Sequence, residues 1–407
     1  MLNLLKIKVS GFKLLEDNFE IDLTAKARVY QMDKSKEIQE IDKGLYVFRS
    51  YAFVGGNSSG KSTVLSLILK VLLFLQTGRF EYIPREFKKD KIDLNIVFYL
   101  NGCLYDYNVT FNKNVDDISS LANKYALITN ESLRKLIYNK AHGIKNMDLL
   151  IKTGEDVSSV FNSSLIDTSA IIKITNSEVF VDDFSNNNIS SFNETILRDS
   201  FFTSLNTCSK ELIAAIVKLL DESIEYIIYD NSDHIRFKKI NEDEVIMTNK
   251  DLIAILSAGT FRGVELYIRC INAIKKGKAL IVDEIENCFQ KNLVSNILFL
   301  FNDEAINKKG AKIFFSTHYV EILDYLQRRD SIFITHKENG LINIKNLYLD
   351  YDVRTELLKS KQFDNNVFNT SLNYKQLLDV RRKLENELHT NNDWRTNWAV
   401  LKCSKVM

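Results

Sequence analysis

The sequence predicts an α/β fold in which helices flank a mixed sheet and an antiparallel β subdomain is attached to it. Three observations predict it: a glycine-rich segment lies between a short apolar run and a helix-length apolar segment, two later apolar runs end in polar residues, and Asn101-Gly102 separates two alternating segments. Continuous apolar runs are typical of parallel strands that are covered on both faces, and Asn-Gly is typical of a hairpin turn.

Composition and charge place the chain among ordinary globular proteins. Of its 407 residues, 45% are hydrophobic and 26% are charged, as in average soluble domains. The net charge of +1 gives the whole molecule no attraction for nucleic acid or for an anionic membrane. The five cysteines are scattered without a CxxC pair, which favours reduced thiols and a cytoplasmic protein. The most apolar segment, Val64–Leu75, is too short to span a bilayer, so we expect no membrane contact.

We expect residues 1–112 to form an N-terminal lobe of the core. Alternation of apolar and polar residues predicts strands, and the longer apolar segment after the glycine-rich turn predicts a buried helix. The predicted elements are two strands within Leu5–Leu23, a strand at Tyr51–Val54, a helix at Thr63–Leu75, and hairpin strands at Ile92–Tyr99 and Leu104–Phe111.

The regular pattern is interrupted over residues 113–209, which we expect to form an α-rich insertion with a helix near Ser132–Lys140. Regularity returns over residues 210–345, the predicted C-terminal lobe. Its predicted elements are a helix over Glu211–Ile228, hairpin strands at Ile235–Phe237 and Val245–Met247, strands at Ala279–Val282 and Ile313–Phe315, and a helix at Gln290–Phe301.

Residues 346–407 are predicted to be a helical C-terminal tail. Tyr374–Leu388 has the apolar spacing of an amphipathic helix, and Trp394 and Trp398 follow it. The tail either packs on the core or docks another subunit, because tryptophan is enriched at binding hot spots.

The glycine-rich segment carries the clearest chemical signal. Residues 55–62 match the phosphate-loop pattern G-x-x-x-x-G-K-[ST] at every fixed position. Such a loop directs backbone N–H groups at phosphate oxygens, Lys61 supplies a charge at the β- and γ-phosphates, and the Ser62 hydroxyl is suited to Mg²⁺. The predicted ATP-binding residues are Gly55, Asn57, Ser58, Ser59, Gly60, Lys61, Ser62 and Thr63.

Two adjacent carboxylates follow the next apolar run. Asp283 and Glu284 come directly after Ala279–Val282, so both are expected at the carboxyl edge of the sheet, where ligands bind in α/β proteins. We expect Asp283 and Ser62 to hold Mg²⁺ and Glu284 to orient and deprotonate the attacking water.

The third apolar run ends in Ser316-Thr317-His318. If its strand lies beside the other two, His318 reaches the same rim as Gly55 and Asp283. It is then placed to contact the γ-phosphate or the attacking water. Glu284, His318 and Lys61 are therefore the predicted catalytic residues.

A fourth segment carries a resemblance to a known superfamily. Leu256–Gly263 (LSAGTFRG) resembles the signature motif of ABC-class ATPases, which include SMC, RecF and OLD-type proteins. The order of phosphate loop, signature, Asp-Glu strand and switch histidine is also similar. Together with GFKLLEDNFEIDL and DEIENCF, the signature looks like that of stand-alone ATPases of PARIS-, Septu- and retron-associated anti-phage systems. The resemblance covers residues 1–112 and 210–345.

This resemblance implies a site shared between subunits. Ser257 and Gly259 of one subunit would close on the γ-phosphate that another subunit holds, in a head-to-tail homodimer or higher oligomer with ATP between the subunits. The segment Asn287-Cys288-Phe289 lies where the resemblance places the D-loop, which crosses the dimer interface. Two departures stand out: no convincing Q-loop glutamine is found, and Thr260 replaces the glutamine of transporter signatures.

Two cellular roles remain open from the sequence. The first is a nucleotide-controlled sensor for a separately encoded effector, such as a nuclease or toxin, in anti-phage defence; we expect it because no second catalytic domain is recognisable. The alternative is a RecF-type DNA-maintenance ATPase, although the charge does not indicate a nucleic-acid partner. A scaffold that binds ATP without turnover is disfavoured by the presence of Glu284 and His318.

Overall fold

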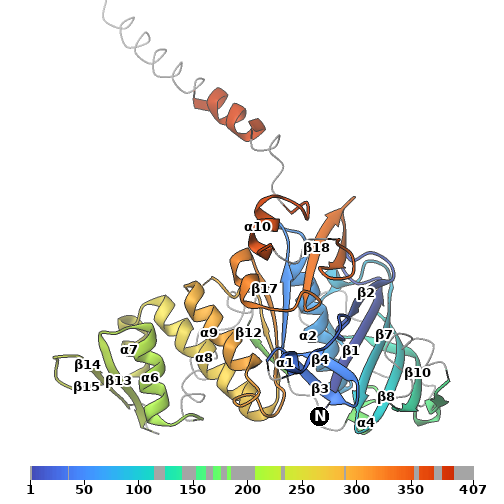
Figure 1. Ribbon diagram of the computed structural model, residues 1–407, viewed down its shortest axis with the longest axis horizontal. Helices are drawn as coiled ribbons and strands as arrows, with labels where there is room; N and C mark the ends of the chain where they lie inside the picture. Colours follow the sequence, from blue (N-terminus) through green and yellow to red (C-terminus); the bar gives the residue numbers. More distant parts are fainter. Residues whose placement is uncertain are drawn as a thin grey trace, which may run out of the picture. The chain divides into compact units, whose positions relative to one another are not determined.

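Two six-stranded sheets lie on either side of one long helix, α2 (Lys61–Thr77), within the structural unit Met1–Ser360 (Figure 1). The computed structural model describes residues 2–34, 36–113, 124–139, 153–161, 168–175, 181–184, 207–230, 234–287, 290–352, 357–370 and 378–388. A second unit comprises Lys361–Met407.

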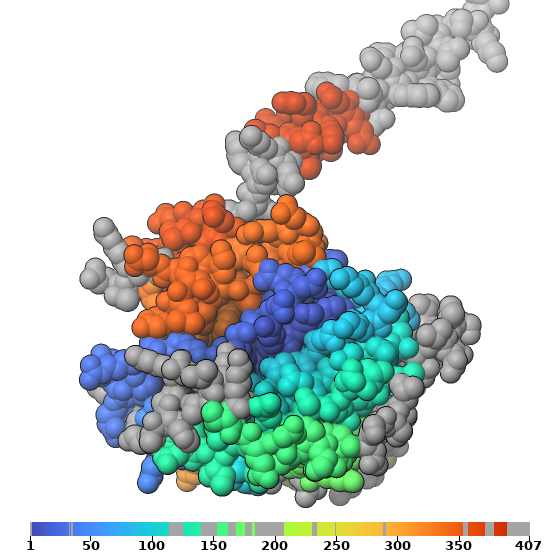
Figure 2. Space-filling view, turned by 90° about the vertical axis from the view of Figure 1, so that its right-hand side faces the viewer, coloured from blue at the N-terminus to red at the C-terminus, as the bar shows by residue number. Residues whose placement is uncertain are grey.

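The first sheet is antiparallel, with the strand order β11-β10-β8-β7-β1-β2. Its strands are β1 (Asn3–Ser10), β2 (Phe19–Asp22), β7 (Lys91–Leu100), β8 (Cys103–Asn112), β10 (Leu127–Ile137) and β11 (Glu155–Asp156). Asn101 and Gly102, both with positive φ, form the tight turn between β7 and β8. In Figure 2 the blue to green surface of this sheet adjoins the orange surface of the later part of the chain.

The second sheet is mostly parallel, with the order β12-β16-β17-β5-β18-β19. Its strands are β5 (Ser50–Val54), β12 (Val181–Phe184), β16 (Ala279–Val282), β17 (Lys312–Thr317), β18 (Ile332–Glu338) and β19 (Leu341–Asn346); only β19 runs antiparallel to its neighbour. Helices α8 (Ala258–Lys276) and α9 (Lys291–Asn302) cover the face opposite α2 (Figure 1).

A smaller sheet, β13 (Ile224–Asp230), β14 (His234–Lys239) and β15 (Val245–Met247), packs on α6 (Lys210–Leu220). The remaining elements are short. They are α1 (Gln31–Lys34), β3 (Ile38–Asp42), β4 (Leu45–Phe48), β6 (Glu81–Tyr82), η1 (Pro84–Glu86), β9 (Lys124–Tyr125), η4 (Ser158–Val160), α4 (Ile172–Thr175), α7 (Asn249–Ile255), η6 (Val320–Tyr325) and α10 (Lys359–Asp364).

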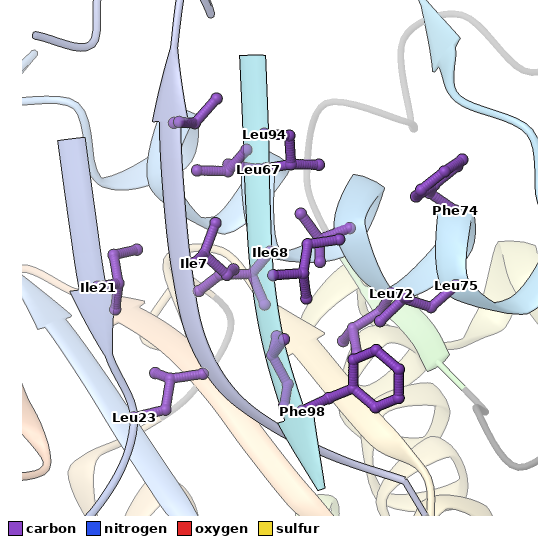
Figure 3. Packing of buried hydrophobic residues seen from close by; sticks show 14 of the residues in the cluster. Ile7, Ile21, Leu23, Leu67, Ile68, Leu72, Phe74, Leu75, Leu94 and Phe98 are labelled. Atoms are coloured by element: carbon purple, nitrogen blue, oxygen red, sulfur yellow. The ribbon is translucent and has the colours of Figure 1, made fainter. Parts of the chain in front are cut away.

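Helix α2 carries apolar side chains over most of its surface, which suits a helix that both large sheets cover. Figure 3 shows Leu67, Ile68 and Leu72 of the helix among Ile7 of β1 and Phe98 of β7. The same buried cluster also includes side chains of β5, β16, β17 and β18. Burial of each large apolar side chain stabilises the fold by about 1.5–3 kcal/mol, so the cluster fixes the helix, and with it the loop that precedes it.

Most of the elements predicted from the sequence are confirmed. The helix predicted at Thr63–Leu75, the hairpins with turns at residues 101–102 and 240–244, and both later parallel strands are present. The tail helix is confirmed over the described residues 378–388. Trp394 and Trp398 lie outside the described residues.

The helix predicted near Ser132–Lys140 is wrong. Leu133, Leu136 and Ile137 have helical spacing, but residues 127–137 form β10 and pair with β8 over ten positions. The described part of residues 113–209 also supplies β12 to the second sheet. The expectation of an α-rich insertion is therefore corrected for these residues, because cross-strand pairing outweighs local periodicity.

The helix predicted over Glu211–Ile228 is too long. α6 ends at Leu220, and Asp221 Oδ1 accepts hydrogen bonds from the backbone N–H and the hydroxyl of Ser223 (3.0 and 2.6 Å). This turn ends the helix, and the β-branched and aromatic residues after it pair with β14 as β13.

No helix among the described residues is long and apolar enough to cross a membrane. Within the same part of the chain, Cys103, Cys208 and Cys270 are free thiols, as predicted. Cys288 and Cys403 lie outside it.

Lys312, at the start of β17, is a buried cation at the amino end of the second sheet. It is 5% exposed, and Nζ donates to Asn3 Oδ1 at 2.6 Å. Burial, and next the charge of Arg49, lower the pKa of Lys312 from its ordinary value of 10.5 to about 7.

We expect Lys312→Met to remove part of the pH dependence of stability. The unfolded lysine keeps its proton up to about pH 10.5, whereas the folded one releases it above about pH 7, so the free energy of unfolding rises with pH in this window. Between pH 7 and 8 the increase is about 1 kcal/mol. Urea denaturation of the wild type, Lys312→Met and the exposed control Lys309→Met at both pH values measures it. Equal pH slopes in all three proteins would contradict the expectation.

Candidate active site

Three neighbouring parallel strands end at one edge of the second sheet. β17 lies between β16 and β5, and both pairs are in parallel register. Gly55 follows β5, Asp283 follows β16 and His318 follows β17. The juxtaposition that the sequence predicts is therefore present, and it forms the edge where ligands bind in α/β sheets.

The loop from Gly55 to Gly60 contains residues with positive φ. Gly60 has a φ of 108°, and Ser58 has a φ of 59°. A Cβ atom added to Gly60 would lie 2.6 Å from Ile342 of β19. Glycine is therefore required here by both the backbone angle and the close approach of β19. Because α2 begins at Lys61, the loop also lies at the N-terminus of a 17-residue helix, which favours anions.

Thr335 of β18 anchors this loop and was not found by sequence reasoning. Its hydroxyl donates to the carbonyl of Val54 (3.2 Å) and shares a hydrogen bond with the buried hydroxyl of Ser59 (2.6 Å). The only sequence signal is a threonine within an apolar strand. The parallel pairing of β18 with β5 brings Thr335 to its partners Val54 and Ser59.

The Lys61 ammonium is largely buried and is held by the loop itself. Nζ donates to the carbonyl oxygens of Gly55 (3.1 Å) and Gly56 (3.2 Å). Burial lowers the pKa of Lys61, while the carboxylates that follow β16, first that of Asp283, oppose this effect. These acidic groups help to keep the lysine charged for phosphate.

Ser62 and Asp283 line one cleft of about 740 Å³, together with Thr63. A hydroxyl and a carboxylate are oxygen ligands of the kind that Mg²⁺ takes beside substrate phosphates. No group of three or more His, Cys, Asp or Glu side chains in the described residues could hold a metal ion. The hydroxyl of Ser62 and the carboxylate of Asp283 are donors that fit Mg²⁺ bound together with a nucleotide.

Glu284 and His318 lie next to each other at the rim. Glu284 Oε1 is 3.7 Å from His318 Nε2, and the two side chains are 36% and 34% exposed. The side chain of Asn287 donates to the other carboxylate oxygen of Glu284. Glu284 has a φ of 52°, a left-handed conformation that costs about 1 kcal/mol or more and is common at functional sites.

A buried serine ties the acidic pair to β17. The hydroxyl of Ser316 donates to Asp283 Oδ1 and accepts the backbone N–H of Glu284 (2.7 Å). The carbonyl oxygen of Ser316 accepts the N–H of Ile285 (3.0 Å). Sequence reasoning assigned Ser316 no role, although its place two residues before the histidine was a usable signal.

Ser257 and Gly259 are exposed at the start of α8. Ser257 caps this helix, since its hydroxyl accepts the N–H of Thr260 (3.0 Å). No hydrogen bond between described residues joins either of them to the phosphate loop.

Comparison with protein families identifies the domain. The chain matches the family described as "AAA domain, putative AbiEii toxin, Type IV TA system" over residues 50–324, more than half of its length. The chain belongs to this family. The match includes the phosphate loop, the LSAGTFRG segment, the Asp-Glu pair and His318.

The AAA domain thus has the P-loop NTPase fold that the sequence predicted, and an antiparallel sheet lies beside its mostly parallel one. Among solved structures, the chain is similar to the "SMC head domain from Thermotoga maritima", at 14% identity and a TM-score of 0.42, over 85% of this chain and 100% of that chain. A comparison with curated proteins found no match.

We expect Gly60→Ala to weaken both folding and ATP binding. The new methyl group meets Ile342 at a φ of 108°, so the variant should lose about 2 kcal/mol or more of stability. Gly340→Ala is the control: its φ is 82° and nothing lies within 4 Å of the added Cβ, so about 1 kcal/mol of strain is expected. Urea denaturation and titration with a fluorescent ATP analogue measure both effects. Equal losses in the two variants would refute the role of β19 in shaping the loop.

Proposed function

We propose that this AAA-domain protein binds and hydrolyses ATP at a head-to-tail subunit interface and acts as a nucleotide-controlled switch for a separately encoded effector. The observation that carries the proposal is the meeting of the phosphate loop, Asp283, Glu284 and His318 at the ends of three adjacent strands. Membership of the AAA family supports ATP binding, and turnover is our inference from the acidic pair and the histidine.

Each side chain has a distinct task in the proposed reaction. The loop N–H groups and Lys61 bind the β- and γ-phosphates, which places the γ-phosphorus for in-line attack. Glu284 orients a water molecule and accepts its proton, and His318 contacts the γ-phosphate or the same water. Ser62 and Asp283 would hold Mg²⁺, which supplies charge neutralisation at the phosphates when it is bound.

The second subunit completes the proposed site. Ser257 and Gly259 are exposed and lie at the N-terminus of the 19-residue helix α8. Such a helix end favours an anionic group. We infer that these residues close on the γ-phosphate held by the partner copy, as the ABC-type signature implies, so that ATP joins two chains.

The cellular role that we propose is anti-phage defence. The family description refers to a toxin and a type IV toxin–antitoxin system, which supports a role beside an effector such as a nuclease or toxin. A RecF-type DNA-maintenance ATPase remains the alternative. The balance of 54 basic and 53 acidic residues gives that alternative no electrostatic support.

We expect Glu284→Gln to bind ATP but to hydrolyse it about 10²–10⁴-fold more slowly, because the amide cannot accept the proton of water. The variant should therefore accumulate the ATP-bound dimer. Phosphate release and the mass in solution, with and without ATP and Mg²⁺, measure the two effects. Hydrolysis at the wild-type rate would show that Glu284 is not the base.

The control for assembly is the double variant Glu284→Gln with Ser257→Arg. The arginine side chain fills the space at the start of α8 where the partner's nucleotide should lie. It should abolish the ATP-dependent dimer while each chain still binds ATP. A dimer that persists in the double variant would refute the head-to-tail arrangement.

We expect the ATPase rate to change severalfold when the effector is bound and to be unaffected by DNA. Hydrolysis by the tagged chain, alone and in complex with a protein encoded beside it, tests the first part; addition of duplex DNA at 50 and 200 mM salt tests the second. A rate that is indifferent to the bound protein would contradict the switch. Stimulation by DNA with steep salt dependence would favour the RecF-type alternative.

A further inference from the structure

A second glutamate beyond β16, Glu286, is buried beside the site. It lies two residues after Glu284 and is 7% exposed. A buried carboxylate is costly unless its oxygens are hydrogen-bonded. The hydrogen-bond partners of the Glu286 carboxylate therefore indicate why this residue is buried at the site.

One oxygen of Glu286 is bonded to the backbone just after β17. Oε1 accepts the backbone N–H of His318, the first residue after β17. The other oxygen, Oε2, is buried and accepts no hydrogen bond from the described residues. The negative charge of Glu286, like that of Asp283, also opposes the effect of burial on the pKa of Lys61.

The backbone around Glu286 and that around His318 are joined at both ends. At one end, Ser316 bonds to Asp283 and to the N–H groups of Glu284 and Ile285. At the other end, Glu286 bonds to His318. The turn 283–286 and the strand end 316–318 therefore form one interlocked unit, in which a displacement of the histidine displaces the base.

We propose that Glu286 is a positioning residue for hydrolysis, which fixes the backbone of His318 so that its imidazole stays beside Glu284. This inference rests on the proposed ATPase activity. Glu286 does not touch the reacting atoms in this proposal; it acts through His318. A misplacement of about 1 Å between catalytic groups costs about 10²-fold in rate, so loss of this single anchor should be measurable.

The test compares Glu286→Ala and Glu286→Gln with the control Glu321→Ala. Glu321 is an exposed glutamate of η6 that forms an ion pair with Lys291 of α9. Alanine should lower kcat for ATP about 10-fold or more while KM changes less than about 3-fold. It should also speed hydrogen exchange of the His318 amide. Glutamine keeps an acceptor oxygen and should restore most of kcat and of the amide protection. The control should behave as the wild type.

The outcomes separate this inference from the proposed function. If the wild type hydrolyses ATP and Glu286→Ala has the same kcat, or the same exchange at His318, the inference is refuted and the ATPase stands. If Glu286→Gln loses as much kcat as Glu286→Ala with the amide still protected, the charge matters and positioning is refuted. A wild type without ATPase activity would refute the proposed function and this inference together.

Discussion

The parallel pairing of β5, β17 and β16 is the constraint on which the site depends. Each strand is buried on both faces, so its backbone groups must be satisfied by its neighbours, which leaves one register for the three. That register sets the phosphate loop, the acidic pair and the histidine side by side, although Gly55 and His318 are 263 positions apart in the sequence. A slip of one residue in β17 would move Ser316 away from Asp283 and turn its hydroxyl to the other face.

The phosphate loop is shaped from outside as much as by its own residues. Thr335 bonds to Val54 and Ser59, and Ile342 closes the space beside Gly60. Both belong to the hairpin β18–β19, whose strands come last in the sequence among those of the second sheet. The loop therefore gains these contacts only when β18 and β19 have joined the sheet. Gly60 allows the backbone to pass close to Ile342.

The sequence predicted the parts of the fold where local and tertiary preferences agree. Val64–Leu75 is apolar over most of its surface and forms α2 between two sheets, and Asn101-Gly102 forms the expected turn. It failed over residues 132–137 and 224–228, where apolar spacing suits a helix but pairing with β8 and β14 makes strands. Sequence reasoning also missed Thr335, Ser316 and Glu286, because their partners lie on other strands and only the sheet order brings them together.

By itself, the sequence determined the phosphate loop, the acidic pair and the expectation of a P-loop domain, because a short loop with fixed glycine, lysine and serine positions is a local motif. The tertiary structure alone decided which groups surround it. The strand order places Ser316 against Asp283 and Glu286 against His318, and Ser257 is exposed as the cap of α8. These contacts are set by long-range sheet pairing and by the burial of α2, which no local pattern encodes.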